Sequence, residues 1–96
     1  MEKYNGWSNY ETWDCKLWLD NDEGTYNHIQ SLAKKVVKVS SDNKTALYEL
    51  SKQIKDFIEE GAPELKASIY SDLLNSAMGK IDYYEIAHNI IDDLSI

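Results

Sequence analysis

Apolar residues recur at helical spacing along most of this 96-residue chain, and short polar or glycine- and proline-containing breaks separate the repeats. The cleanest repeat consists of Leu47, Leu50, Ile54, Phe57 and Ile58. It predicts one buried face of a helix over about 43–60. Similar repeats predict four more helices, over about 9–20, 23–38, 63–78 and from just after Asp82. No alternating strand pattern competes with them, so we expect an all-α fold: one compact domain of about five helices spanning residues 1–96.

The stretch over residues 7–22 contains all three tryptophans of the chain. Ser8 and Glu11 have the spacing of a capping box, so a helix is predicted to begin at about Asn9. Residues 1–6 are expected to form a short extended lead-in that ends at a glycine.

One face of this first helix is expected to lie in the core. Tyr10, Trp13 and Leu17 fall at i, i+3 and i+7, and Trp18 continues the edge of the same face. An aromatic side chain buries roughly 150–250 Å², so Trp13 is predicted to anchor much of a small core.

The ends of the other helices carry recognisable signals. Asp22 and Asp42 are predicted N-caps, Gly61 a helix stop, and Pro63 the first turn of a fourth helix. The fourth helix is expected to turn four apolar residues inward: Leu65, Ile69, Leu73 and Ala77. Asp82 and Glu85 resemble a second capping box, at the start of the fifth helix.

Cysteine use and hydropathy indicate a compartment. A single cysteine, Cys15, permits no internal disulfide, which fits a reducing environment. The first twenty residues show no apolar signal-peptide core, and no apolar run approaches the ~20 residues of a membrane span. We therefore expect a cytoplasmic protein.

The charge of the chain is acidic and unevenly distributed. Seventeen acids against ten lysines give a net charge of −7, and arginine is absent. Because arginine is the usual residue for bidentate phosphate and guanine contacts, direct nucleic-acid binding is not expected. The alternative is a regulator or accessory protein that binds nucleic acid through a lysine cluster over residues 34–44. Its lysines are Lys34, Lys35, Lys38 and Lys44.

Candidate catalytic groups are few. Cys15 has only His28 and His88 as possible bases, and the chain lacks the further Cys and His ligands that a zinc site needs. The stretch 20–24 superficially resembles a calcium loop, but Gly24 and Ser31 stand where ligands belong. We predict no enzymatic activity, no cofactor and no metal.

Two stretches of the chain carry a resemblance to a known family. The first is Gly6-Trp7-Ser8-Asn9-Tyr10-Glu11-Thr12-Trp13, which continues into Leu17-Trp18-Leu19-Asp20-Asn21-Asp22. The second is Asp82-Tyr83-Tyr84-Glu85-Ile86-Ala87. Both are similar to motifs of a family of small proteins of unknown function from phages, plasmids and other mobile elements. The resemblance covers about a third of the chain, and it implies no catalytic residues.

What the resemblance implies is an accessory gene of a mobile element. Small acidic proteins of that kind are often inhibitors of host defence, of the anti-CRISPR or anti-restriction type. We therefore expect non-enzymatic binding to a host protein, such as a nucleic-acid-handling defence complex, whose phosphate-binding groove would attract acidic side chains.

The residues expected to serve these roles form two groups. The candidate partner-binding residues are acids near helix ends and two tyrosines: Glu59, Glu60, Tyr83, Tyr84, Asp92 and Asp93. The residues of the family motif, expected to be structural, are Trp7, Ser8, Asn9, Tyr10, Glu11, Trp13 and Trp18.

Overall fold

A computed structural model describes residues 3–94 and shows five α-helices in that range. They are α1 (Tyr10–Asn21), α2 (Glu23–Val39), α3 (Asn43–Glu60), α4 (Ile69–Gly79) and α5 (Tyr83–Leu94). No strand is present between residues 3 and 94, so the all-α prediction is confirmed. Residues 1 and 2 of the expected lead-in lie outside the described residues.

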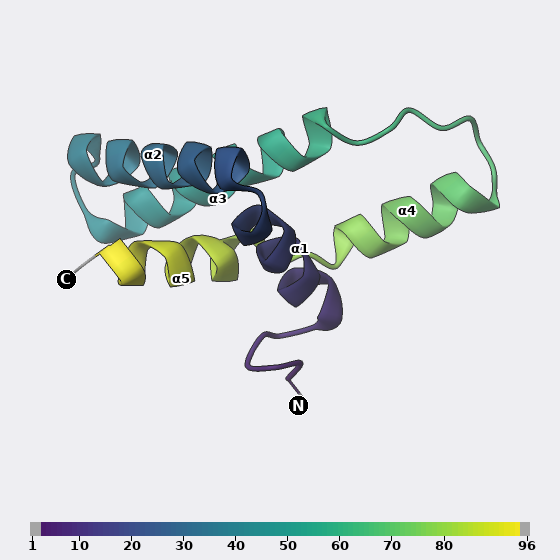
Figure 1. Ribbon diagram of the computed structural model, residues 1–96, viewed down its shortest axis with the longest axis horizontal. Helices are drawn as coiled ribbons and strands as arrows, with labels where there is room; N and C mark the ends of the chain where they lie inside the picture. Colours follow the sequence, from purple (N-terminus) through teal and green to yellow (C-terminus); the bar gives the residue numbers. More distant parts are fainter. Residues whose placement is uncertain (1–2, 95–96) are drawn as a thin grey trace.

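Four of the helices enclose the core. α2 and α3 run antiparallel, α5 lies along α3, and α1 crosses beside α2 and α5 (Figure 1). The core consists of buried apolar side chains from these four helices: Cys15, Leu19, Ile29, Ala33, Val36, Ala46, Leu47, Leu50, Ile54, Ile86, Ala87, Ile90 and Ile91. Most of the predicted apolar faces of α2, α3 and α5 therefore supply this core.

The predicted caps of α2 and α3 are also confirmed. The Asp22 carboxylate accepts hydrogen bonds from the backbone N–H groups of Gly24 and Thr25, at 2.9 and 3.4 Å. The Asp42 carboxylate accepts from the Thr45 N–H at 2.7 Å, and this bond holds the pKa of Asp42 below its usual value. Both caps satisfy N–H groups that have no partner within the helix.

The predicted buried face of α1 is wrong. Leu17 is 37% exposed, Tyr10 is exposed and Trp13 is only half-buried, whereas the core-facing residues are Thr12, Cys15 and Leu19. Both sets have the spacing i, i+3, i+7, but the second is two residues later. At about 100° per residue it lies on nearly the opposite side of the helix.

The aromatic residues of the rejected face pack against one another instead. The ring of Tyr4 lies 5.2 Å from that of Tyr10, edge to face, and 5.0 Å from that of Trp13. Such pairs stabilise by about 0.5–1.5 kcal/mol beyond the area that they bury. Trp13 therefore belongs to a surface aromatic cluster with Tyr4 and Tyr10, and it is not an anchor of the core.

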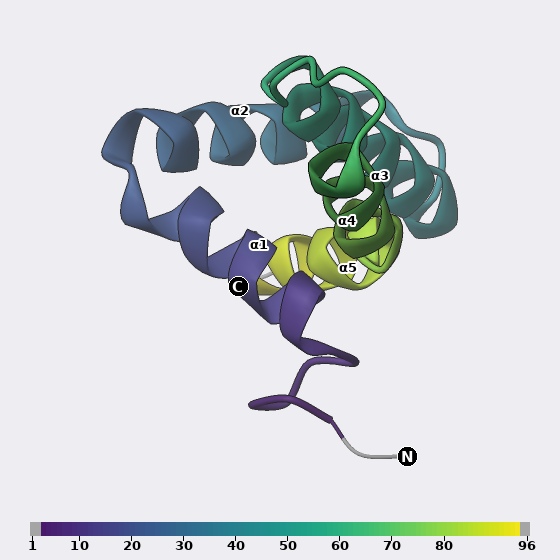
Figure 2. The same cartoon turned by 90° about the vertical axis from the view of Figure 1, so that its right-hand side faces the viewer.

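α4 also differs from its prediction. It begins at Ile69 and not near Pro63, because Ser68 and Ser71 form a reciprocal capping box there. None of its described side chains is buried. The helix extends away from the other four, as the views in Figures 1 and 2 show. The radius of gyration is 14.1 Å, larger than the roughly 13 Å typical of 100 residues, which is consistent with a helix that projects.

Within residues 3–94, no helix combines the length and the hydropathy that a bilayer crossing requires.

Candidate functional site

The two family-like stretches meet in space. Residues 8–12 contact residues 80–85 through side-chain hydrogen bonds, and we call this set of contacts the motif junction. Both the backbone N–H and the hydroxyl of Ser8 donate to the Glu85 carboxylate, with a shortest distance of 2.7 Å. The prediction that Ser8 is the N-cap of α1 is therefore wrong. Ser8 instead attaches the N-terminal stretch to α5.

Asn9 is the N-cap of α1. Its Oδ1 accepts from the Thr12 N–H at 2.8 Å, while its Nδ2 donates to the Lys80 carbonyl at 2.7 Å. One amide thus begins α1 and joins it to the segment before α5.

Thr12 completes the motif junction from inside the protein. Its side chain is fully buried, and its Oγ1 accepts the Asp82 N–H at 2.9 Å. Asp82 in turn accepts from the Glu85 N–H at 3.0 Å. This is one half of the predicted Asp82–Glu85 capping box, and the other half does not form. The Glu85 carboxylate accepts hydrogen bonds from Ser8 instead, and the Thr12 hydroxyl accepts the Asp82 N–H.

A tight turn precedes the motif junction, where the sequence predicted an extended lead-in. Tyr4 and Trp7 exchange backbone hydrogen bonds of 2.7 and 2.8 Å, and Asn5 and Gly6 between them have φ of 49° and 89°. Two positive φ angles in a two-residue turn are typical of type I′, for which Asn-Gly is the preferred pair. That pair could have revealed the turn. Trp7, at its end, packs against the core.

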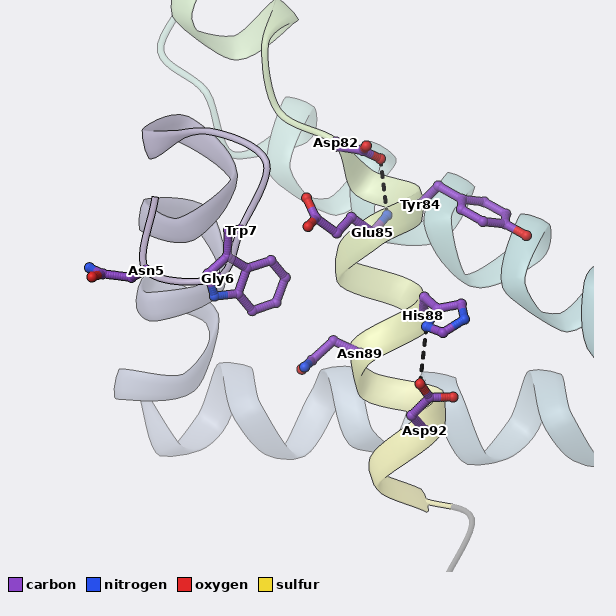
Figure 3. Close-up of a pocket in the computed structure, with 9 residues that line it drawn as sticks. All are labelled: Asn5, Gly6, Trp7, Asp82, Tyr84, Glu85, His88, Asn89 and Asp92. Atoms are coloured by element: carbon purple, nitrogen blue, oxygen red, sulfur yellow. Dashed lines mark hydrogen bonds and ion pairs between the residues drawn. The ribbon is translucent and has the colours of Figure 1, made fainter. Parts of the chain in front are cut away.

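A hollow of about 480 Å³ lies between this turn and α5 (Figure 3). Glu85 and Asn89 point from α5 toward Trp7, whereas Tyr84 and His88 project from α5 away from Trp7, with Asp92 one turn beyond His88 (Figure 3). His88 Nδ1 lies 3.1 Å from Asp92. The surface is acidic and polar, and it suits a cationic or hydrogen-bonding group of a partner.

The other candidate partner-binding residues lie elsewhere. Glu59 and Tyr83 line a second hollow of about 390 Å³ between the end of α3 and α4. Asp93 lines a third, which it shares with Lys34. α3 and α5 run antiparallel, so the acids at their C-terminal ends lie at opposite ends of the pair (Figure 1). The six residues do not form one surface.

The two tyrosines also differ. Tyr84 is exposed, whereas the Tyr83 hydroxyl is buried and has no hydrogen-bond partner among residues 3–94. Burial, with smaller effects of Cys15 and Glu59, raises the pKa of Tyr83 to about 12. Tyr84 remains a candidate contact residue, and Tyr83 belongs to the packed interior.

The residues of the N-terminal motif also separate by environment. Glu11 is half-buried, and Trp18 is 69% exposed. Trp18 is thus the most exposed tryptophan of the motif.

The candidate nucleophile of the sequence is Cys15. Cys15 is buried, and desolvation together with the charge of Asp14 raises the pKa of its thiol to about 11, so it is not an activated nucleophile. In the part of the chain that the structure describes, no three His, Cys, Asp or Glu side chains are grouped as metal ligands.

The lysine cluster lies on the surface. Its four side chains are exposed, on the second half of α2 and the first turn of α3. Lys34 shares a hollow with Asp20 and Asp93, so acids border this one lysine of the cluster.

Comparison with known proteins gives one result. No curated protein and no solved structure matches the chain. A family model matches residues 1–93, which include both halves of the motif junction, and its description is "Family of unknown function (DUF7249)". The chain therefore belongs to the DUF7249 family of unknown function.

Proposed function

We propose that this protein acts by non-enzymatic binding to another protein and that its principal contact is the uncovered apolar face of α4. Ile69, Tyr70 and Leu73 are 67%, 73% and 62% exposed, and together they define the α4 face. This is the observation that carries the proposal, because contiguous exposed apolar side chains typically mark interaction sites.

The isolation of α4 supports a binding role. A helix of this length is marginally stable in water unless an amphipathic face is packed against something. The α4 face is left to solvent, although the sequence pattern is that of a buried stripe. A partner that covered Ile69, Tyr70 and Leu73 would supply the packing that the rest of this chain does not provide.

The class of partner follows from the family-like motifs and from charge. The resemblance to mobile-element proteins directs the proposal to a host protein, and inhibition of a nucleic-acid-handling defence system of the anti-CRISPR or anti-restriction type is the role that we propose. A protein that binds nucleic acid offers a basic surface, and a chain of net charge −7 would be steered toward it.

The acidic helix ends would act as two separate steering sites. Glu59 and Glu60 lie near α4, whereas Asp92 and Asp93 lie at the far end of α5. Charge reversal of Glu59 and Glu60 to Lys should therefore slow association more than reversal of the other pair, because the first pair is closer to the α4 face.

The test is capture from a host lysate with matched variants. The wild-type protein should retain a partner that Ile69→Gln/Leu73→Gln loses, while Tyr48→Gln, an exposed aromatic on α3, should retain it. Gln keeps helix propensity and removes the apolar contact, and circular dichroism checks the fold. Equal capture by the α4 variant and the wild type would refute the role of α4.

The alternative function, nucleic-acid binding through the lysine cluster, predicts a different result. Binding through phosphates would weaken steeply with salt and would be lost when Lys34, Lys35 and Lys38 are changed to Gln. We expect no appreciable binding to DNA or RNA at physiological salt, since the net charge is −7, arginine is absent and acids lie beside Lys34. A sub-micromolar shift of labelled DNA or RNA, abolished by the triple substitution, would establish the alternative.

A further inference from the structure

Trp18 borders an apolar hollow at the protein surface. The hollow has a volume of about 320 Å³ and is lined chiefly by Trp18, Leu19, Thr25, Phe57 and Ile58, with Asp22 at its edge. We call it the Trp18 hollow. Trp18 is 69% exposed, so a large aromatic surface borders an apolar depression at the corner between α1 and α2.

Three helices build the Trp18 hollow, and local contacts fix its walls. Asp22 caps α2 through the N–H groups of Gly24 and Thr25, which holds the corner next to Trp18. On the opposite wall, Phe57 packs partly on the core, with the His28 ring centred 5.2 Å away. The depression is therefore formed before any partner binds, which lowers the ordering cost of binding.

Carboxylates surround Trp18 along α1. Asp14 lies one helical turn before Trp18 on α1. Asp22 follows α1 as its C-cap and is among the residues that line the hollow. The one lysine of α1, Lys16, is paired with Asp20. Of the described residues, no lysine lines the hollow. An apolar depression with an acidic border is complementary to an apolar group with cationic neighbours.

We propose that the Trp18 hollow binds an apolar side chain of a partner protein segment whose flanking residues are arginine or lysine. The apolar side chain fills the depression against Phe57 and Ile58. A flanking cation lies over the exposed indole of Trp18, where a cation–π contact is favourable, and near the carboxylates of Asp14 and Asp22. The proposal rests on the proposed protein-binding function and names the chemistry of a second contact, separate from the α4 face.

The test uses two synthetic peptides of equal charge, Arg-Arg-Leu-Leu-Arg-Arg and Arg-Arg-Ser-Ser-Arg-Arg, with both ends blocked. Calorimetric titration at physiological salt should show at least tenfold tighter binding of the leucine peptide. Trp18→Ser should weaken that binding at least tenfold. Tyr48→Ser should leave it unchanged, since Tyr48 is 61% exposed and lies about two and a half turns from Phe57 on α3. Asp14→Asn should weaken both peptides.

Each contrary outcome has a distinct meaning. Equal affinity for the two peptides would show charge attraction alone and would overturn the proposal, as would full binding by folded Trp18→Ser. If Ile69→Gln/Leu73→Gln no longer binds the leucine peptide while Trp18→Ser still binds it, the peptide contact belongs to the α4 face. That result would overturn the Trp18 hollow as the binding site but not the proposed protein-binding function. The proposed function fails separately, when the α4 variant captures as much host partner as the wild type.

Discussion

Thr12→Val should destabilise the protein even though it preserves the size of a buried side chain. Thr12 is fully buried, and its Oγ1 is the acceptor for the Asp82 N–H at 2.9 Å. Valine replaces that acceptor by a methyl group and leaves the Asp82 N–H of this partly buried bond facing an apolar side chain. Leaving a buried donor unsatisfied costs about 1–3 kcal/mol, so we expect a loss of about 2 kcal/mol in the free energy of unfolding.

The matched control is Thr12→Ser, which keeps the hydroxyl and removes the methyl group. Loss of one buried methyl group costs about 1 kcal/mol, so the serine variant should be more stable than the valine variant. If packing alone mattered, the order would be reversed, because valine fills the site and serine does not. The comparison therefore separates the hydrogen bond from the volume of the side chain.

The assay is urea unfolding of both variants, followed by circular dichroism. About 2 kcal/mol corresponds to a fall of roughly 8–16 °C in Tm for a domain of this size, so thermal unfolding provides an independent reading. A valine variant as stable as the wild type, or more stable than the serine variant, would refute the role assigned to Thr12 in the motif junction.

Three further predictions concern Glu85, Cys15 and Tyr83. Glu85→Gln should lose about 1–2 kcal/mol in urea unfolding, because the neutral amide lacks the charge that strengthens the hydrogen bonds from Ser8 and places an NH2 group where the second carboxylate oxygen accepts the Ser8 N–H; an unchanged midpoint would contradict this. Cys15 has a pKa raised from 9.0 to about 11, so the folded protein keeps a proton that the unfolded chain loses, and stability falls as pH rises. Between pH 8.5 and 10 the wild type should lose about 1 kcal/mol more than Cys15→Ala, and equal slopes would refute the assignment. Tyr83→Phe should be neutral or stabilising by up to about 1 kcal/mol in thermal unfolding, since the buried hydroxyl has no partner among the described residues; a loss above 1 kcal/mol would indicate a bond to this hydroxyl.

Local signals explain what could be predicted from the sequence. α2 and α3 have one apolar face each and an aspartate at the N-cap, so their limits and buried sides follow from interactions within a few residues. The turn at Asn5-Gly6 is equally local, and the Asn-Gly pair in the sequence is its signal.

The errors arise where distant parts of the chain decide the outcome. Two faces of α1 have the same helical spacing, and a hydrogen bond between Thr12 and Asp82, seventy residues apart, favours the face with fewer aromatic residues. In α4 the apolar pattern identifies side chains suited to burial, but it does not state what covers them. Leu65 is the one large apolar residue between Ala62 and Ile69, so this segment has little with which to hold α4 against α3.

The sequence also predicts only part of the candidate site. Acids at helix ends can be read from the sequence, but the antiparallel packing of α3 and α5 separates Glu59 from Asp92. The exposure of Trp18 could not be read from its helical position, because it depends on which face of α1 meets α5.

The most direct test of the account is the stability of Ile69→Gln/Leu73→Gln, measured as the free energy of unfolding of the isolated protein. The central claim is that the α4 face is exposed for a partner and contributes nothing to the core. Exposed substitutions usually change stability by no more than about 0.5 kcal/mol, whereas large-to-small changes in a core, such as Leu50→Ala, cost about 2–5 kcal/mol. We predict an unfolding free energy within about 0.5 kcal/mol of the wild type. A loss of about 2 kcal/mol or more would show that the α4 face is packed within this chain, and it would contradict the claim.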